Sequence, residues 1–146
     1  MGYLFRVACL VSLSFALSQP AGSQNCTPDK ETANRHFIEA HTALFDYLSL
    51  AHLCAPYLGQ AFVTSGISKT EDFMAQLGIG RNDAIILAEV TNQKAIGAAA
   101  KYDLPAIAKQ TGNETTISMR CIDQLNNAMH QYDVARAKMA KAQCAP

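Results

Sequence analysis

The spacing of apolar residues is the feature that most limits how this 146-residue chain can fold. In two long segments, residues 82–110 and the segment that begins near Thr115 or Thr116, side chains of one stripe recur at alternating steps of four and three. Such steps place side chains on one face of an α-helix, and an average of ~3.5 residues fits helices packed nearly parallel or antiparallel. We find no strand-like alternation, so the sequence predicts an all-α protein. The stripes are Ala84, Ala88, Thr91, Ala95, Ala98 and Tyr102, then Cys121, Leu125, Ala128, Tyr132, Ala135 and Met139.

A third stripe predicts a first long helix that begins near Thr27, the expected cap, and ends just before Pro56, because the residue before a proline avoids the α region. This stripe consists of Phe37, His41, Leu44, Leu48 and Ala51.

Two short helices are expected between the first long helix and the segment 82–110. One begins at Pro56 and stops near Gly66. Ser68 and Glu71, three residues apart, match a capping box for the next, and Gly78 supplies its left-handed end. With short connections, the chain predicts a four-helix-like up-down-up-down bundle whose second arm is split into two short helices.

The first 23 residues are predicted to be a secretory signal peptide. Arg6 precedes an apolar run of eleven residues, Val7–Leu17, which is shorter than the ~20 residues that span a bilayer. Small residues follow, and they favour cleavage after Ser23, with Ser18 as the second choice. Residues 24–146 are then expected to form a single helical domain. The competing interpretation is a buried N-terminal helix.

Charge and composition exclude some functions. Removal of Arg6 leaves 11 basic and 12 acidic residues, so the mature net charge is 11 − 12 = −1. A near-neutral chain without tryptophan offers no electrostatic or stacking surface for nucleic acid. Cys9 lies inside the apolar run rather than after it, so we expect no lipid anchor. Because the run is also too short to span a bilayer, we expect no membrane anchor.

Four cysteines remain after cleavage, and an even number in an exported chain favours two disulfides. If the first and last helices are antiparallel, Cys54 meets Cys121 and Cys26 meets Cys144. The helical distances between the cysteines are similar, at ~42 Å from Cys26 to Cys54 and ~35 Å from Cys121 to Cys144. Parallel helices would instead join Cys26 to Cys121, and this pairing stays open.

We find no catalytic motif and no metal-ligand spacing, so we expect no catalytic residue, no metal and no cofactor. His41 and Met129 are the candidates for a haem or small-ligand site inside the bundle, although each is more typical of packing. Relative position along the helices predicts that His41 faces Tyr132 closely enough for a direct or water-bridged hydrogen bond.

The segment "SMRCID" at 118–123, with Cys54 far upstream, resembles the second-cysteine region of small periplasmic helical immunity proteins that block type VI secretion amidases. The resemblance covers these six residues and the cysteine spacing, and it implies a protein partner.

The leading hypothesis is therefore an exported, non-enzymatic bundle that binds a protein partner or ligand. It would be periplasmic in a bacterium and secreted elsewhere, where the acceptor triplets at Asn25 and Asn113 would matter. The alternatives are a small-ligand or haem carrier and an immunity-like inhibitor.

Overall fold

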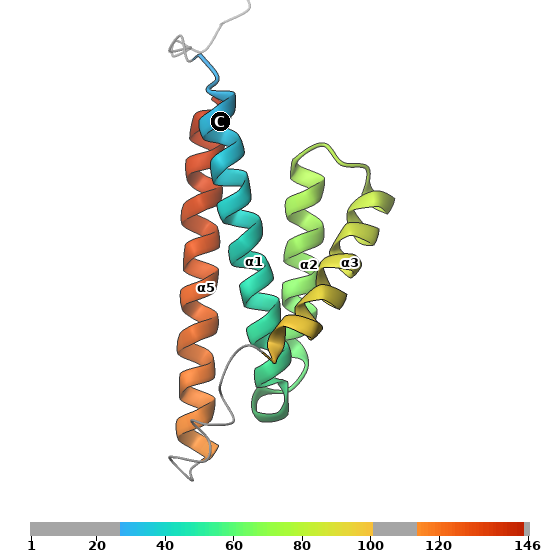
Figure 1. The fold of residues 1–146 in the computed structure, drawn as a ribbon, viewed down its shortest axis with the longest axis vertical. Coiled ribbons are helices and arrows are strands. Elements are labelled where there is room, and N and C mark those ends of the chain that lie inside the picture. Colours follow the sequence, from blue (N-terminus) through green and yellow to red (C-terminus); the bar gives the residue numbers. More distant parts are fainter. Residues whose placement is uncertain (1–26, 101–113, 145–146) are drawn as a thin grey trace, which may run out of the picture.

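A computed structural model of the chain describes residues 27–100 and 114–144, and within these ranges it contains four helices and no strand. The helices alternate in direction along the chain (Figure 1). The all-α prediction is confirmed for this part of the chain. Predictions about the signal peptide, Asn25, Cys26, Tyr102 and Asn113 fall outside the described residues. The helices are α1 (Lys30–Leu58), α2 (Ala61–Gln76), α3 (Arg81–Ala99) and α5 (Glu114–Ala142).

Helix α1 is the centre of the arrangement. It packs against α2, α3 and α5, whereas α5 lies along α1 and makes no extensive contact with α3 in the described structure (Figure 1). The molecule is thus an α1–α5 pair with the α2–α3 hairpin on one side. Because α1 has three neighbours, its buried residues extend beyond the single predicted stripe and include Ala40, Tyr47 and Leu50.

Both ends of α1 differ from the prediction. Asp29, rather than Thr27, is the cap, and its carboxylate accepts a hydrogen bond of 3.0 Å from the backbone N–H of Thr32. The helix also continues through Pro56 to Leu58. Pro56 has no backbone N–H to donate, but because it lies in the last turn of α1, few helical hydrogen bonds are formed beyond it. Gly59, with φ of 80°, ends the helix because a left-handed residue there is best supplied by glycine.

The prediction of a split second arm is wrong, because α2 runs without interruption from Ala61 to Gln76. Gly66 lies inside this helix and allows α2 to approach α1 closely. A Cβ atom placed on Gly66 would lie 2.7 Å from Cδ2 of Leu48 and 3.0 Å from the ring of Tyr47. Gly78, with φ of 81°, follows the end of α2 as predicted.

The disulfide between Cys54 and Cys121 is present as predicted, with 5.8 Å between the two Cα atoms. Both residues are fully buried at the end of α1 and the beginning of α5. The pairing of Cys26 with Cys144 stays a prediction, because Cys26 lies outside the described residues. At that end of the pair, the N–H of Asp29 donates to the carbonyl of Ala142 over 2.9 Å, so the two helix ends are adjacent.

The core lies where α2 packs on the α1–α5 pair. Phe73 of α2 is fully buried, and its ring meets that of Tyr132 edge-on at 5.6 Å between centroids. All six members of the predicted α5 stripe are buried, which confirms the face assigned to this helix. No helix in the described residues is both long enough and apolar enough to span a bilayer.

Candidate interaction surface

The inward face of α3 is made of small residues, as the sequence predicts. Ala84, Ala88 and Ala95 are almost completely buried. These small side chains allow α3 to pack closely against α1 and α2. The stripe members Thr91 and Ala98 are buried as well.

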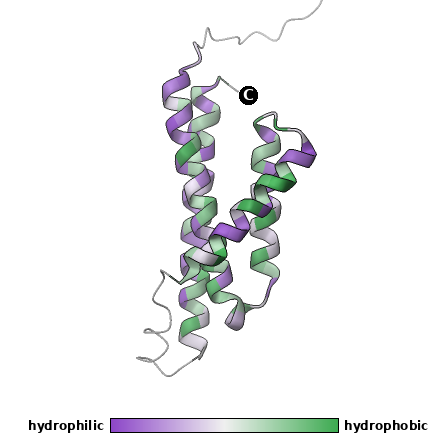
Figure 2. Cartoon of the chain, turned by 45° about the vertical axis from the view of Figure 1, so that its right-hand side comes forward, coloured by the Kyte–Doolittle hydropathy of each residue, from purple (hydrophilic) through white to green (hydrophobic). Residues whose placement is uncertain are grey.

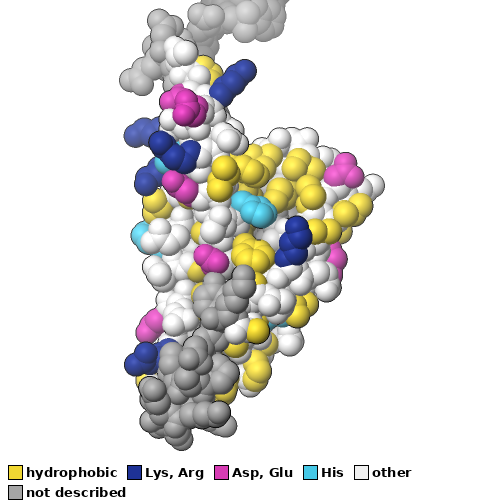
Figure 3. Space-filling model, viewed as in Figure 1, with side chains coloured by type: hydrophobic (Ala, Val, Ile, Leu, Met, Phe, Trp, Pro, Cys, Tyr) yellow, Lys and Arg dark blue, Asp and Glu magenta, His cyan; other side chains and the backbone are white. Residues whose placement is uncertain are grey.

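The outward-facing side of α3 carries the large aliphatic side chains, which is the reverse of an ordinary surface helix. Ile86 is 59% exposed, the largest exposed fraction among these residues. The green stretch in the α3 ribbon shows this apolar run (Figure 2). On one face of the molecule, hydrophobic side chains gather over α2 and α3, whereas charges line the α1–α5 side (Figure 3). The exposed aliphatic residues of α3 are Ile85, Ile86, Leu87, Val90 and Ile96.

Four residues lie in a line along the middle of this exposed surface, again at steps of four, three and four. We call them the α3 seam: Ile86, Val90, Gln93 and Gly97. A Cβ atom added to Gly97 would have no described atom within 4 Å, so the seam is open at this position. Glu89 and Lys94 flank it, and the side-chain N–H of Gln93 donates to the carboxylate of Glu89 over 2.7 Å.

A second surface feature is the groove between α1 and α5, with a volume of about 590 Å³. Its floor is apolar, formed by Ala43, Leu50 and Ala128. One wall carries the carboxamides Gln124, Asn127 and Gln131, and the other carries Glu39, Thr42 and Asp46, with Ile38 on the rim.

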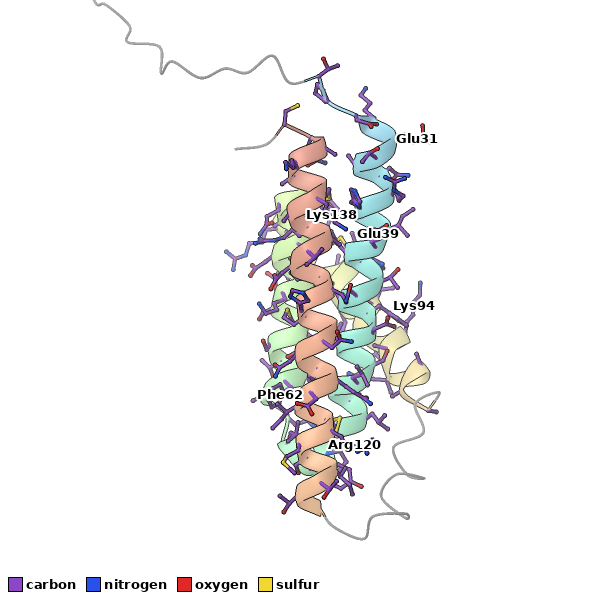
Figure 4. All side chains as sticks on the ribbon, turned by 90° about the vertical axis from the view of Figure 1, so that its left-hand side faces the viewer. Glu31, Glu39, Phe62, Lys94, Arg120 and Lys138 are labelled. Carbon is purple, nitrogen blue, oxygen red and sulfur yellow. A yellow bond between two sulfur atoms is a disulfide. The ribbon has the colours of Figure 1, made fainter. Side chains whose placement is uncertain are left out.

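The carboxylate of Glu39 in this groove is held in its charged form. A hydrogen bond from His36, 2.7 Å away, lowers the pKa of Glu39, and the positive charge of Lys138 acts in the same direction. Figure 4 shows Glu39 and Lys138 on the neighbouring helices α1 and α5.

His41, the leading candidate for a ligand site, is half-buried on the side of α1 that faces away from α5. Burial, and then the positive charge of Lys94, lower the pKa of His41, so the neutral imidazole is favoured. Lys94 of α3 lies on the far side of α1 from α5 (Figure 4). The ring of His41 stacks on Phe37, with 6.1 Å between centroids.

Met129, the other cofactor candidate, packs against the apolar core clusters. Neither His41 nor Met129 lines the α1–α5 groove. Among the described residues, no group of three or more His, Cys, Asp or Glu side chains is placed to hold a metal ion.

The described structure has no direct hydrogen bond between His41 and Tyr132, which is one of the two forms of contact predicted. The two rings are instead linked through Phe37 and Phe73, which stack on each other at 5.7 Å. The prediction assumed that the stripe of α1 faces the last helix alone, and it overlooked Phe73, which α2 inserts beside it.

A polar pair that the sequence analysis missed links α1 to α3. Nε2 of His52 lies 2.7 Å from Oδ1 of Asn92, an amide oxygen that can only accept, so the imidazole donates. Asn92 is 7% exposed, and this bond satisfies its buried oxygen. Asn92 lies one residue from the alanine stripe, and its polar side chain gave no reason to expect burial.

In comparisons with protein-family models, curated proteins and solved structures, none matches this chain.

Proposed function

We propose that this chain is an exported, non-enzymatic protein that binds another protein through the exposed face of α3. The observation that supports this function is the inverted helix: alanines are buried and five large aliphatic side chains are in contact with water. Contiguous exposed apolar surface is typical of interaction sites.

The energetics favour covering this face. Full burial of an Ile, Leu or Val side chain stabilises by about 1.5–3 kcal/mol relative to exposure. Each of the five side chains is 39–59% exposed in the folded chain, so part of the free energy of burial is not gained on folding. A partner with an apolar surface would gain it on binding.

Export is supported by the Cys54–Cys121 disulfide, since such bonds persist in oxidising compartments. An inhibitor of a secreted enzyme, as the resemblance at residues 118–123 implies, is one form that this function would take. Of those residues, Cys121 is fully buried in the disulfide, whereas Met119 is 54% exposed. The α3 face lies outside this segment.

Site-specific photo-crosslinking in the native compartment tests the proposal. A photoreactive residue at position 90 should capture a defined protein, whereas one at position 137, which is exposed on α5 and outside the α1–α5 groove, should not. The captured protein is then purified and titrated against the chain. Ile86→Glu should weaken this binding at least about tenfold, or about 1.4 kcal/mol. Unchanged affinity would refute the role of α3.

The α1–α5 groove favours a second candidate function, the binding of a small cationic ligand. Ionised Glu39, the three carboxamides and the apolar floor fit a cation that has an apolar body and hydrogen-bond donors. A tri-arginine peptide is a suitable probe for NMR titration. Glu39→Gln should weaken its binding severalfold, whereas Glu31→Gln, an exposed acid on α1 outside the groove, should not. Equal effects would indicate nonspecific attraction.

A further inference from the structure

The geometry points to a second copy of this chain as a partner of the α3 face, with the two α3 helices parallel and their seams in contact. This inference rests on the proposed function, because it names the occupant of the same surface. It is carried by the spacing of the seam and by the charges beside it.

The seam has the spacing of a coiled-coil contact. Ile86, Val90, Gln93 and Gly97 follow one another at the alternating steps that keep one line of side chains facing a partner helix. In a parallel pair, each of these residues meets its own counterpart across a two-fold axis. Two isoleucines and two valines then form apolar layers, and the open surface at Gly97 permits close approach of the backbones.

The flanking charges are complementary only when the helices are parallel. Glu89 precedes the seam residue Val90, and Lys94 follows the seam residue Gln93. In a parallel coiled coil, the residue that precedes a seam position on one helix faces a partner residue five positions further along the sequence. That partner residue is the one that follows the next seam position. Glu89 of each copy therefore faces Lys94 of the other, and the symmetry forms this pair twice.

An antiparallel pair lacks this complementarity. There, the residues that precede seam positions face one another, which places Glu89 opposite Ile96. The residues that follow seam positions also face one another, which places Lys94 opposite Leu87. Both arrangements bury aliphatic side chains, so the charges decide between them.

The contact is short. Its four layers on one helix offer less area than the ~800 Å² per partner of a standard interface, so we expect a reversible dimer with a dissociation constant in the micromolar range. Both molecules keep their α1–α5 grooves outside the contact, because the grooves belong to other helices.

Sedimentation equilibrium of the exported, oxidised chain, between micromolar and millimolar concentration, tests the inference. Val90→Glu should raise the dissociation constant at least about tenfold, because two carboxylates would meet across the axis. Ile85→Glu is the matched control: it lies on the same helix, has the same 44% exposure as Val90 and is outside the seam, and it should change dimerisation little. Circular dichroism checks that both variants remain folded.

Charge exchange tests the parallel arrangement. Glu89→Lys alone and Lys94→Glu alone should each weaken the dimer severalfold, and the double variant should restore it. A dimer that survives Val90→Glu, or a double variant that is as weak as the singles, would overturn the seam or its direction. If the wild-type chain is monomeric throughout while the crosslinked partner still requires Ile86, the second copy is wrong and the proposed function stands.

Discussion

Helices α5 and α3 both pack on α1, and they use their residues in opposite ways. Helix α5 buries full-sized side chains such as Leu125 and Tyr132, and it is joined to α1 by a disulfide. Helix α3 buries alanines and exposes Ile86 and Val90. Helix α5 thus buries its large apolar side chains in the core, whereas α3 exposes its large apolar side chains, where they can contact a partner.

The largest expected effect concerns the covalent link of α5. Replacing both Cys54 and Cys121 with alanine should lower the free energy of unfolding by about 4 kcal/mol, because the bond closes a loop over 67 residues. Chemical denaturation of the oxidised wild type and the double variant measures this. A loss below about 1 kcal/mol would mean that packing alone holds α5 in place.

Leucine and isoleucine truncations compare the two helices directly. Leu125→Ala should cost about 2–5 kcal/mol, because it leaves a cavity in the core between α1 and α5. Ile86→Ala should change the free energy of unfolding by less than about 0.5 kcal/mol, because Ile86 is 59% exposed. Urea melts at low concentration, where dimers are absent, measure both. Similar losses would show that α3 does not expose this residue.

Overpacking tests the inner face of α3. Ala95→Leu should destabilise the fold by about 1–3 kcal/mol, since the alanine is fully buried and the added carbons would enter a close helix contact. Lys94→Leu, one residue away and exposed, is the control and should affect folding little. Thermal melts that shift equally for both variants would contradict the assignment of the buried face.

Two glycine substitutions should act in opposite directions. Gly97→Ala should stabilise the chain by about 0.5–1 kcal/mol, because alanine favours helices and the added carbon meets nothing. Gly66→Ala should destabilise it, because the same carbon would press on Leu48 and Tyr47 in the core. Stabilisation by both would mean that α1 and α2 can move apart without cost.

The smallest effect is a pH dependence from His41. Its pKa is lowered in the folded chain, so the unfolded chain binds more protons once the pH falls to the ordinary value of 6.5. Its contribution to stability is therefore complete above pH 6.5 and is lost as the pH falls through the lowered pKa. His41→Gln should flatten this part of the curve of unfolding free energy against pH, whereas Asn126→Gln, an exposed change that involves no titratable group, should leave it unchanged.

Helical periodicity predicted the fold class and the buried faces of α3 and α5, because these faces repeat regularly along the sequence. It failed where a single residue has two possible roles. Pro56 and Gly66 commonly interrupt helices, but here one lies in a last turn and the other provides a close contact.

The candidate surface was harder to predict than the fold. The alanine stripe of α3 was assigned to the inside from the sequence, but nothing in the sequence indicated that Ile86 and Val90 would be exposed. That depends on α5 packing against α1 and away from α3. The bond between His52 and Asn92 depends in the same way on how two distant helices meet.

The disulfide also determines what a protease can do to this molecule. Residues 54–121 form a covalent ring that contains α2 and α3, whereas most of α1 and α5 lie on the two chain ends outside it. A single cut anywhere within the ring yields two fragments that remain joined. On a gel without reductant the nicked protein would migrate as one species, and it would separate only when the sulfur–sulfur bond is reduced. A cleaved copy can therefore keep α1 and α5 together.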